Sequence, residues 1–318
     1  MPLISAFILT FASCSDKYFI SDGPTWGTSY HIVYSASTPL DSEIKDVLEL
    51  VNNELSMFNP SSRVSRINAG STDSAGIYFS EVFTLAQKIN HLSRGVYDPT
   101  VGPLTDLWGF GRKQISATPS DSAIAIALSA VGIGDCSITA DGLVVKKSPA
   151  TVFDFSSIAK GYGVDLVGRM LEKNGVENYM IEIGGEILVK GVNPQGRLWH
   201  IQIDSPESGL DHKQLSIVAL GPERTAMASS GNYRNFRKDA NGKTYGHTLS
   251  PITGYPVEGF IPAATVIAPD CATADALATA CMASAHPDSA IAILNRAKVA
   301  GLVVDTALTV IKTANFPK

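Results

Sequence analysis

The sequence is short of charged residues. Asp, Glu, Lys and Arg make up only 17% of the 318 residues, below the roughly 25% of an average globular chain, whereas 45% are hydrophobic. The 25 Lys and Arg are outnumbered by 30 Asp and Glu, which gives a net charge of −5. Without a basic excess the chain is poorly suited to neutralising nucleic-acid phosphates. The composition therefore excludes a disordered chain, disfavours a nucleic-acid partner, and allows one large domain or two modest ones.

Cysteines and cofactor motifs are also scarce. The four cysteines are Cys14, Cys136, Cys271 and Cys281. They are too few for a disulfide scaffold and no pair has zinc-finger spacing, so we expect the last three to be free packing thiols. The run Gly132-x-Gly134 lacks the third glycine of a dinucleotide fingerprint, and the chain has neither a P-loop motif nor a His-Glu-x-x-His motif. Rossmann, P-loop and zinc-hydrolase functions are therefore disfavoured.

The first fourteen residues, MPLISAFILTFASC, form an uncharged apolar run that ends in small residues. The run is too short to span a bilayer, but it has the apolar core and cleavage site of a secretory signal; a buried first strand is the alternative. Its end, Phe11-Ala12-Ser13-Cys14, resembles a bacterial lipobox. We therefore expect a leader over residues 1–14, a folded domain over residues 15–318, and a protein lipid-anchored at the periplasmic side of the bacterial cell envelope.

Beyond the leader, helical and strand patterns alternate. Apolar residues at helical spacing predict helices over 40–58, 80–92, 120–131, 160–174, 273–285 and 287–297. Apolar runs predict strands over 179–192, hinged at Gly184-Gly185, and over 199–204, 215–220, 264–268, 302–305 and 308–313. Asp41 is the expected cap of the first helix. The sequence predicts an α+β fold with mixed sheets and packed helices, in which any two lobes are interwoven because no segment is typical of a linker.

The most informative pair of side chains lies in the helix predicted over 273–285. Asp275 and Thr279 are four residues apart, which places a carboxylate and a hydroxyl on one helical face. Both are hard oxygen ligands, and Mg²⁺ usually takes few protein ligands together with water and substrate phosphates. The alternative is a helix-start Asp and a mid-helix Thr that bonds back to the backbone.

Two polar segments could supply further chemistry. His247 lies in a turn-rich stretch and has the side chain best suited to act as a base near neutral pH; the alternative is a surface histidine. Ser230 precedes Gly231 in a run of small residues that would let backbone amides approach an anion, although a structural turn is the more common cause of such a run. A hydrolase triad of Ser230, His247 and Asp275 lacks the Gly-x-Ser-x-Gly elbow.

Aromatic residues interleaved with glycine form a third kind of signal. They occur at Tyr97 and in the run Trp108-Gly109-Phe110. Such residues can wall a site for a flat ring, and core packing is the alternative.

Taken in order, these segments resemble the ApbE family of bacterial FAD:protein FMN transferases. The similarity begins at Trp26 and covers nearly all of the remaining chain. Its blocks are 55–62 (LSMFNPSS), 97–100 (YDPT), 107–111 (LWGFG), 154–165 (DFSSIAKGYGVD), 182–186 (EIGGE), 229–231 (SSG), 245–254 and 272–279 (ATADALAT).

The resemblance implies a T-fold-like architecture with two interwoven lobes and an enzyme that splits the pyrophosphate of FAD. AMP would be released, and FMN would be attached through a phosphoester to a Thr or Ser of a partner protein, either a membrane redox subunit or a secreted flavoprotein. The family's Mg²⁺ ligands map onto the backbone carbonyl of Ala159 and the side chains of Asp275 and Thr279.

The remaining roles follow from the same resemblance. His247 is the expected base for the acceptor hydroxyl, with Asp275 as the rival, and Lys160 would steady phosphate oxygens. The expected FAD contacts are Met57, Phe58, Tyr97, Trp108, Gly109, Phe110, Asp154, Ser156, Lys160 and Ser230. Two alternatives stay open: a Mg²⁺-dependent FAD pyrophosphatase that yields FMN and AMP, and a lipid-anchored flavin-binding protein without turnover.

Overall fold

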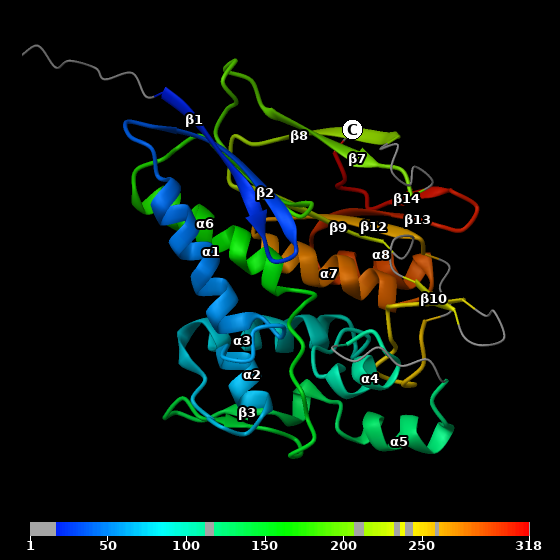
Figure 1. The fold of residues 1–318 in the computed structure, drawn as a ribbon. Helices are drawn as coiled ribbons and strands as arrows, with labels where there is room; N and C mark the ends of the chain where they lie inside the picture. The colour runs from blue at the N-terminus through cyan, green and yellow to red at the C-terminus, as the bar shows by residue number, and fades with distance from the viewer. Residues whose placement is uncertain are drawn as a thin grey trace, which may run out of the picture.

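The computed structural model describes residues 17–111, 118–206, 213–231, 236–238, 244–257 and 261–317. The leader predicted over residues 1–14 lies outside these ranges. Among the described residues no helix is both long and apolar enough to cross a membrane. The α+β class with packed helices is confirmed (Figure 1).

The centre of the fold is an eight-stranded sheet in which neighbouring strands pair antiparallel. In spatial order its strands are β1 (Lys17–Thr25), β2 (Thr28–Ala36), β5 (Tyr179–Ile183), β6 (Glu186–Lys190), β9 (Thr225–Gly231), β12 (Ala263–Ala268), β13 (Ala300–Val304) and β14 (Val310–Lys312). Gly184 and Gly185 turn the chain between β5 and β6, and both have positive φ values, 62° and 98°, that glycine adopts without strain. The hinge predicted there is confirmed. The first and last strands of the chain form opposite edges of the sheet.

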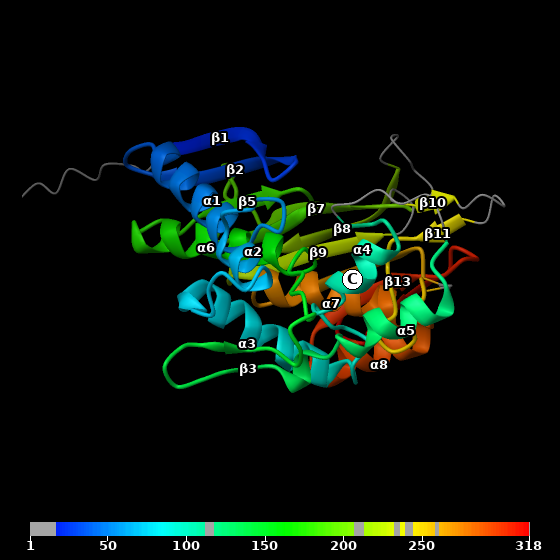
Figure 2. The ribbon, with the colours of Figure 1, turned by 60° about the horizontal axis from the view of Figure 1, so that its bottom comes forward.

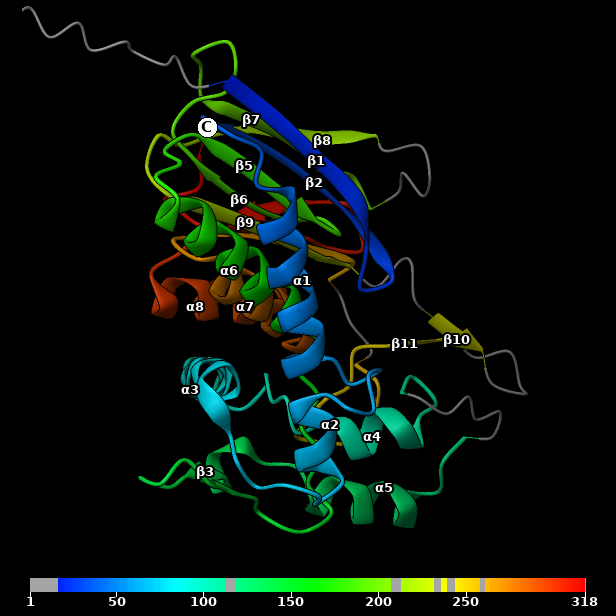
Figure 3. The same cartoon turned by 60° about the vertical axis from the view of Figure 1, so that its left-hand side comes forward.

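Helices cover one face of this sheet and a hairpin covers the other (Figure 3). The helices are α1 (Asp41–Leu55), α6 (Ala159–Lys173), α7 (Cys271–Ala283) and α8 (Pro287–Ala297). The hairpin consists of β7 (Trp199–Asp204) and β8 (Gln214–Leu220), whose apolar residues pack against the sheet. Helix α1 forms because its apolar residues recur at helical spacing and are buried along one stripe. Helix α7 is different, because 10 of its 13 residues are buried. Its small side chains let it pack between the sheet and the surrounding helices.

Residues 56–155 form a second lobe below the helices, seen from below in Figure 2. Its elements are α2 (Arg63–Asn68), α3 (Gly76–Leu92), α4 (Gly102–Leu107), α5 (Asp121–Ser129), a 3₁₀ turn at Ile133–Asp135, β3 (Ser137–Ile138) and β4 (Val144–Val145). Its core contains four mutually packed phenylalanine rings, those of Phe79, Phe83, Phe153 and Phe155. The two lobes are joined by α3, which contacts α7 and α8.

The chain returns to the second lobe after two short strands, β10 (Phe236–Lys238) and β11 (Thr244–Gly246). In residues 245–257 the carbonyl of Gly254 accepts a hydrogen bond from Trp108 Nε1 at 2.8 Å, and the Tyr255 hydroxyl donates to Asp121 at 2.7 Å. The lobes are therefore interwoven, because each contains segments from both halves of the sequence.

Two local predictions were wrong. Asp41 is the first residue of α1 and not its cap; its carboxylate instead accepts a hydrogen bond from Ser21 Oγ of β1, 2.7 Å away. Residues 225–231 are not a turn but the strand β9, which lies between β6 and β12. Small residues fit there because α7 packs closely against that strand. Cys136, Cys271 and Cys281 are free and buried, as predicted.

Candidate active site

A cavity of about 400 Å³ lies between the helix-covered face of the sheet and the second lobe. Its walls come from α6, α7, β6, β9, the second lobe and the return segment 245–257. The predicted site residues that line it are Tyr97, Asp154, Ser156, Lys160, Ser230, His247, Asp275 and Thr279. Residues separated by up to 182 positions in the sequence thus share one cavity; we call it the catalytic cavity.

Asp275 and Thr279 lie on the wall formed by α7. The Asp275 side chain is buried, and its Oδ2 accepts a hydrogen bond from the backbone N–H of Gly161 at 3.1 Å. Thr279 lies one turn further along the helix, with its Oγ1 3.5 Å from Ser230 Oγ. Glycine is required at 161 because a Cβ there would lie 2.4 Å from the carbonyl oxygen of Cys271. The close approach of α6 and α7 therefore brings Ala159 and Lys160 next to the Asp275 carboxylate.

Lys160, Glu186 and Asp275 interact with one another in the catalytic cavity, which Asp98 and Asp154 also line. Lys160 Nζ forms an ion pair with Glu186 Oε1, whereas Glu186 Oε2 is buried without a hydrogen-bond partner among the described residues. Burial and the Asp275 charge raise the pKa of Glu186 to about 8, although Lys160 lowers it. Burial also raises the pKa of Asp275. Burial lowers the pKa of Lys160, but the two carboxylates raise it by more, so Lys160 stays protonated. A cation bound beside Glu186 and Asp275 would favour their ionised forms and so lower both pKa values.

A second cavity of about 710 Å³ adjoins the first. Both are lined by Ser156 and Lys160, and the second also contains Ala159, Met57 and Phe58. Met57 is buried, whereas Phe58 is 75% exposed at the edge of the cavity. The remaining lining residues include Trp26, Val51 and Leu55, so this space, which we call the apolar cavity, suits a flat ring.

Comparison with known proteins identifies the family. The ApbE family matches residues 26–303 of the sequence. The chain belongs to the ApbE family. A curated FAD:protein FMN transferase of Vibrio cholerae is 36% identical over 87% of this chain and 85% of its own length, and one of Haemophilus influenzae is 35% identical over 86% and 83%.

Solved ApbE structures share the fold. A flavin transferase ApbE from Vibrio cholerae superposes with a TM-score of 0.83 at 32% identity, covering 95% of this chain and 98% of the other. The apo flavinyl transferase ApbE of Pseudomonas stutzeri gives a TM-score of 0.83 at 33% identity, covering 94% and 96%. The T-fold-like ApbE architecture expected from the sequence is therefore confirmed.

The aromatic block of this ApbE chain lies apart from both cavities. Trp108 is only 3% exposed, and its ring packs against Tyr245 and Tyr255 at centroid distances of 5.4 and 6.0 Å. Gly109 and Phe110 adjoin it, and none of the three lines the catalytic or the apolar cavity. Their contact with FAD stays a prediction. In the structure they support the return segment that carries His247.

Two acidic residues of the catalytic cavity were not predicted as site residues. Glu186 follows the Gly184-Gly185 turn at the start of β6, so the only sequence signal was its place in the family block 182–186. Asp98 is also buried, but it accepts hydrogen bonds from the backbone N–H groups of Thr100 (2.8 Å) and Ile133 (2.9 Å). Asp98 therefore fixes the loop that carries Tyr97, whereas Glu186 still has an oxygen available for a ligand.

Proposed function

We propose that this chain catalyses Mg²⁺-dependent transfer of FMN from FAD to a Thr or Ser hydroxyl of a partner protein. The class of enzyme, a flavin transferase, follows from membership of the ApbE family and from relatives named FAD:protein FMN transferase. The observation that carries the proposal is the pair of buried Asp275 and half-buried Thr279, which lines a cavity together with Lys160 and Glu186. That cavity adjoins the apolar cavity.

The joined cavities suit a dinucleotide. FAD consists of two flat ring systems linked through a pyrophosphate. Met57 and Phe58 in the wall of the apolar cavity suit one ring system. The other would lie in the catalytic cavity, whose lining includes Tyr97. Lys160 lies where the cavities meet, so its ammonium group can bind the pyrophosphate between the rings.

The residues present suit Mg²⁺. In the described part of the chain no three His, Cys, Asp or Glu side chains lie close enough to hold a metal by themselves, so a metal site needs other oxygens. The Asp275 carboxylate, the Thr279 hydroxyl and the Ala159 carbonyl would supply them, which is the sparse, hard donor set that leaves Mg²⁺ free to bind phosphate. The bound ion would neutralise charge that develops on the pyrophosphate as AMP leaves. Four acidic side chains and one lysine line this cavity, and this excess of acidic groups supports a cation there.

His247 is the proposed base. Its segment lines the catalytic cavity opposite α7, whereas Asp275 already accepts a hydrogen bond from Gly161 and belongs to the proposed metal set. In the reaction the acceptor oxygen bonds to the phosphorus of the FMN half, and the bond from that phosphorus to the bridging oxygen breaks. The AMP half leaves with that oxygen, and the hydroxyl proton passes to His247.

The decisive experiment follows FMN by mass spectrometry. Residues 15–318 are incubated with FAD, Mg²⁺ and candidate acceptor proteins, and we expect one acceptor to gain covalent FMN while AMP appears in equal amount. Asp275→Ala should reduce the rate at least about 100-fold, since metal and phosphate binding are lost together. Asp288→Ala, which removes an exposed acid from α8, is the matched control. AMP release without an acceptor adduct would favour a pyrophosphatase, and FAD binding without AMP release would favour a flavin-binding protein.

The cellular location is a further part of the proposal. The lipobox-like run ending at Cys14 supports an exported protein, lipid-anchored at the periplasmic side of the cell envelope. Expression of the full chain should place it in the membrane fraction, and Cys14→Ser should release it. A Cys14→Ser protein that stays in the membrane fraction would refute the anchor.

A further inference from the structure

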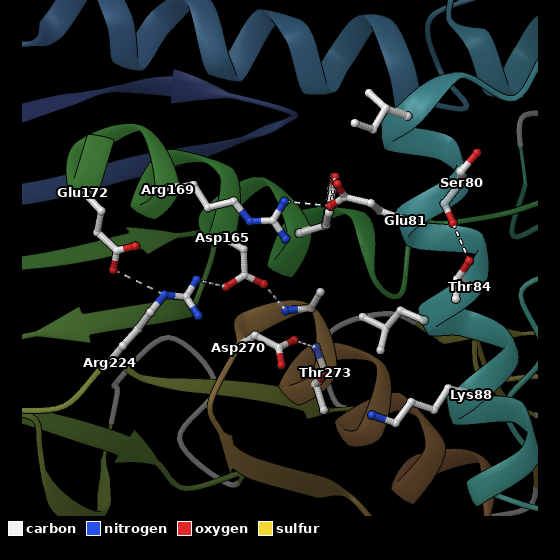
Figure 4. A pocket seen from close by; sticks show the side chains of 14 residues that line it. Ser80, Glu81, Thr84, Lys88, Asp165, Arg169, Glu172, Arg224, Asp270 and Thr273 are labelled. Atoms are coloured by element: carbon white, nitrogen blue, oxygen red, sulfur yellow. Dashed lines mark hydrogen bonds and ion pairs between the residues drawn. The ribbon is translucent and has the colours of Figure 1, made fainter. Parts of the chain in front are cut away.

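A third cavity is lined by residues of α3, α6 and α7, and Figure 4 shows it from close by. It has a volume of about 840 Å³ and opens between α3, α6 and the first turn of α7. We call it the outer groove; it shares no lining residue with the catalytic cavity. Arg169 pairs with Glu81 across it, and Arg224 pairs with both Asp165 and Glu172. They connect α6 to different neighbours, so they need not have the same role.

Asp165 holds the beginning of α7. Its side chain is 3% exposed, its Oδ1 accepts the N–H of Cys271 at 2.9 Å, and its Oδ2 accepts the N–H of Ala272 at 2.8 Å. The first N–H groups of a helix have no partner within the helix, and a carboxylate there is also favoured by the helix dipole. Because Asp165 belongs to α6 and not to α7, these bonds fix one helix against the other.

Arg224 extends this connection to the sheet. Its Nη2 donates to Asp165 Oδ1 at 2.7 Å, and its Nη1 donates to the carbonyl of Pro269 at 2.8 Å, just before α7. Arg224 itself directly precedes β9, which carries Ser229 and Ser230 into the catalytic cavity. The Asp165 and Arg224 pair therefore connects α6, α7 and β9 at the ends that face the outer groove.

Other residues of α6, α7 and β9 line the catalytic cavity. Gly161 lies one turn before Asp165 on α6, and it donates to Asp275, which lies one turn after Cys271 and Ala272 on α7. Helix α6 therefore holds α7 at two points, one backbone contact inside the catalytic cavity and one carboxylate contact outside it. Loss of the outer contact would leave α7 positioned by the Gly161 to Asp275 bond and by packing between small side chains.

We propose that Asp165 and Arg224 are positioning residues for the metal site: they fix α7 along its axis, and so set the distance of Asp275 and Thr279 from Ala159 and Lys160. This inference rests on the proposed function, because it assigns the pair an effect on the proposed Mg²⁺ ligands. Neither residue lines the catalytic or the apolar cavity.

The test compares Asp165→Asn, Arg224→Ala and Arg224→Lys with Arg169→Ala. The control removes an ion pair from the same groove and the same helix, but one that joins α6 to Glu81 of α3. Three quantities are measured: the dissociation constant of Mn²⁺ in the presence of FAD, kcat and KM for FAD in the acceptor assay, and hydrogen exchange at the Cys271 and Ala272 amides.

We expect Asp165→Asn to weaken Mn²⁺ binding about 10- to 100-fold, the range typical of residues that orient metal ligands. Its kcat should fall by a similar factor, with KM for FAD changed less than about threefold, because FAD is bound mainly by other residues. The amides of Cys271 and Ala272 should exchange faster. Arg224→Lys should lie between Arg224→Ala and the original protein, and Arg169→Ala should leave Mn²⁺ binding within about twofold.

The outcomes distinguish failure of the positioning role from failure of the proposed function. Variants that unfold at lower temperature but bind Mn²⁺ and turn over as the original protein does would overturn the positioning role and leave only a structural one. An original protein that neither binds Mn²⁺ nor transfers flavin would refute the proposed function itself. If Asp165→Asn does not fold, the two Arg224 variants, which retain the Asp165 carboxylate, are compared with Arg169→Ala in the same three measurements.

Discussion

Replacement of Gly161 by Ala should separate α6 from α7. The added Cβ would lie 2.4 Å from the carbonyl oxygen of Cys271 and 2.9 Å from the Cα of Ala272, and both are backbone atoms that no rotamer change can move aside. Ordinary contacts begin at 3.4 Å, so the helices must part by about 1 Å. That displacement stretches the bond from Gly161 N–H to Asp275, which is already 3.1 Å long.

The expected magnitudes follow from this shift. Overpacking of this kind costs about 1–3 kcal/mol of folding free energy, and misplacement of catalytic groups by about 1 Å costs about 100-fold in rate. Differential scanning calorimetry measures the first effect and FMN transfer measures the second. The matched control is Gly134→Ala, because a Cβ at Gly134 has no heavy atom within 4 Å. A Gly161→Ala protein with the kcat and unfolding temperature of the control would refute the close-packing argument.

Three further predictions concern other parts of the molecule. Burial raises the pKa of Glu81, but hydrogen bonds from Arg169 and Tyr162 lower it by a larger amount. The pKa of Glu81 is therefore below its ordinary value of 4.5. Glu81 therefore stabilises the fold above pH 4.5, and Glu81→Gln should lower stability by up to about 1 kcal/mol at pH 7. In thermal unfolding the two proteins should converge as the pH falls through the lowered pKa; a constant difference would contradict the assignment. The three buried cysteines should resist a thiol reagent in folded protein of residues 15–318 and react after unfolding, whereas rapid reaction at any of them would contradict their burial. Trp108→Phe leaves the Gly254 carbonyl without its donor and should cost about 1–3 kcal/mol by denaturant unfolding, with an unchanged KM for FAD; a raised KM would instead place Trp108 against the flavin.

The helices were predictable because their signals are local. Residues 41–55 repeat apolar side chains at helical spacing, and the structure forms α1 there, within three residues of the predicted ends. Strand β9 gave no such signal, because the run from Thr225 to Gly231 has few of the branched or aromatic residues typical of strands. It is a strand because β6 and β12 lie on either side of it, which no short window of sequence can indicate.

The site was predictable where its chemistry depends on residues that are close together in the sequence. Asp275 and Thr279 stood out because four-residue spacing on a helix places them together, and the structure confirms that both line one cavity. Glu186 was missed because its importance comes from an ion pair with Lys160, 26 positions away. The packing of Trp108 could not be predicted either, since its hydrogen bond to Gly254 spans 146 positions and holds the ring in a packed cluster. Its contact with FAD stays a prediction.

The burial of α7 limits what the sequence block 272–279 can say about whether a related protein is an active enzyme. Of its thirteen residues, only Thr273, Thr279 and Ala283 are not fully buried, and each of these lines either the outer groove or the catalytic cavity. Most of the block is therefore small for reasons of packing and would be needed even in a relative that had lost its chemistry. Asp275 and Thr279 are the two residues of the block that indicate a metal site. A family member with the alanines intact but another residue at either position should keep the fold and lack the metal site.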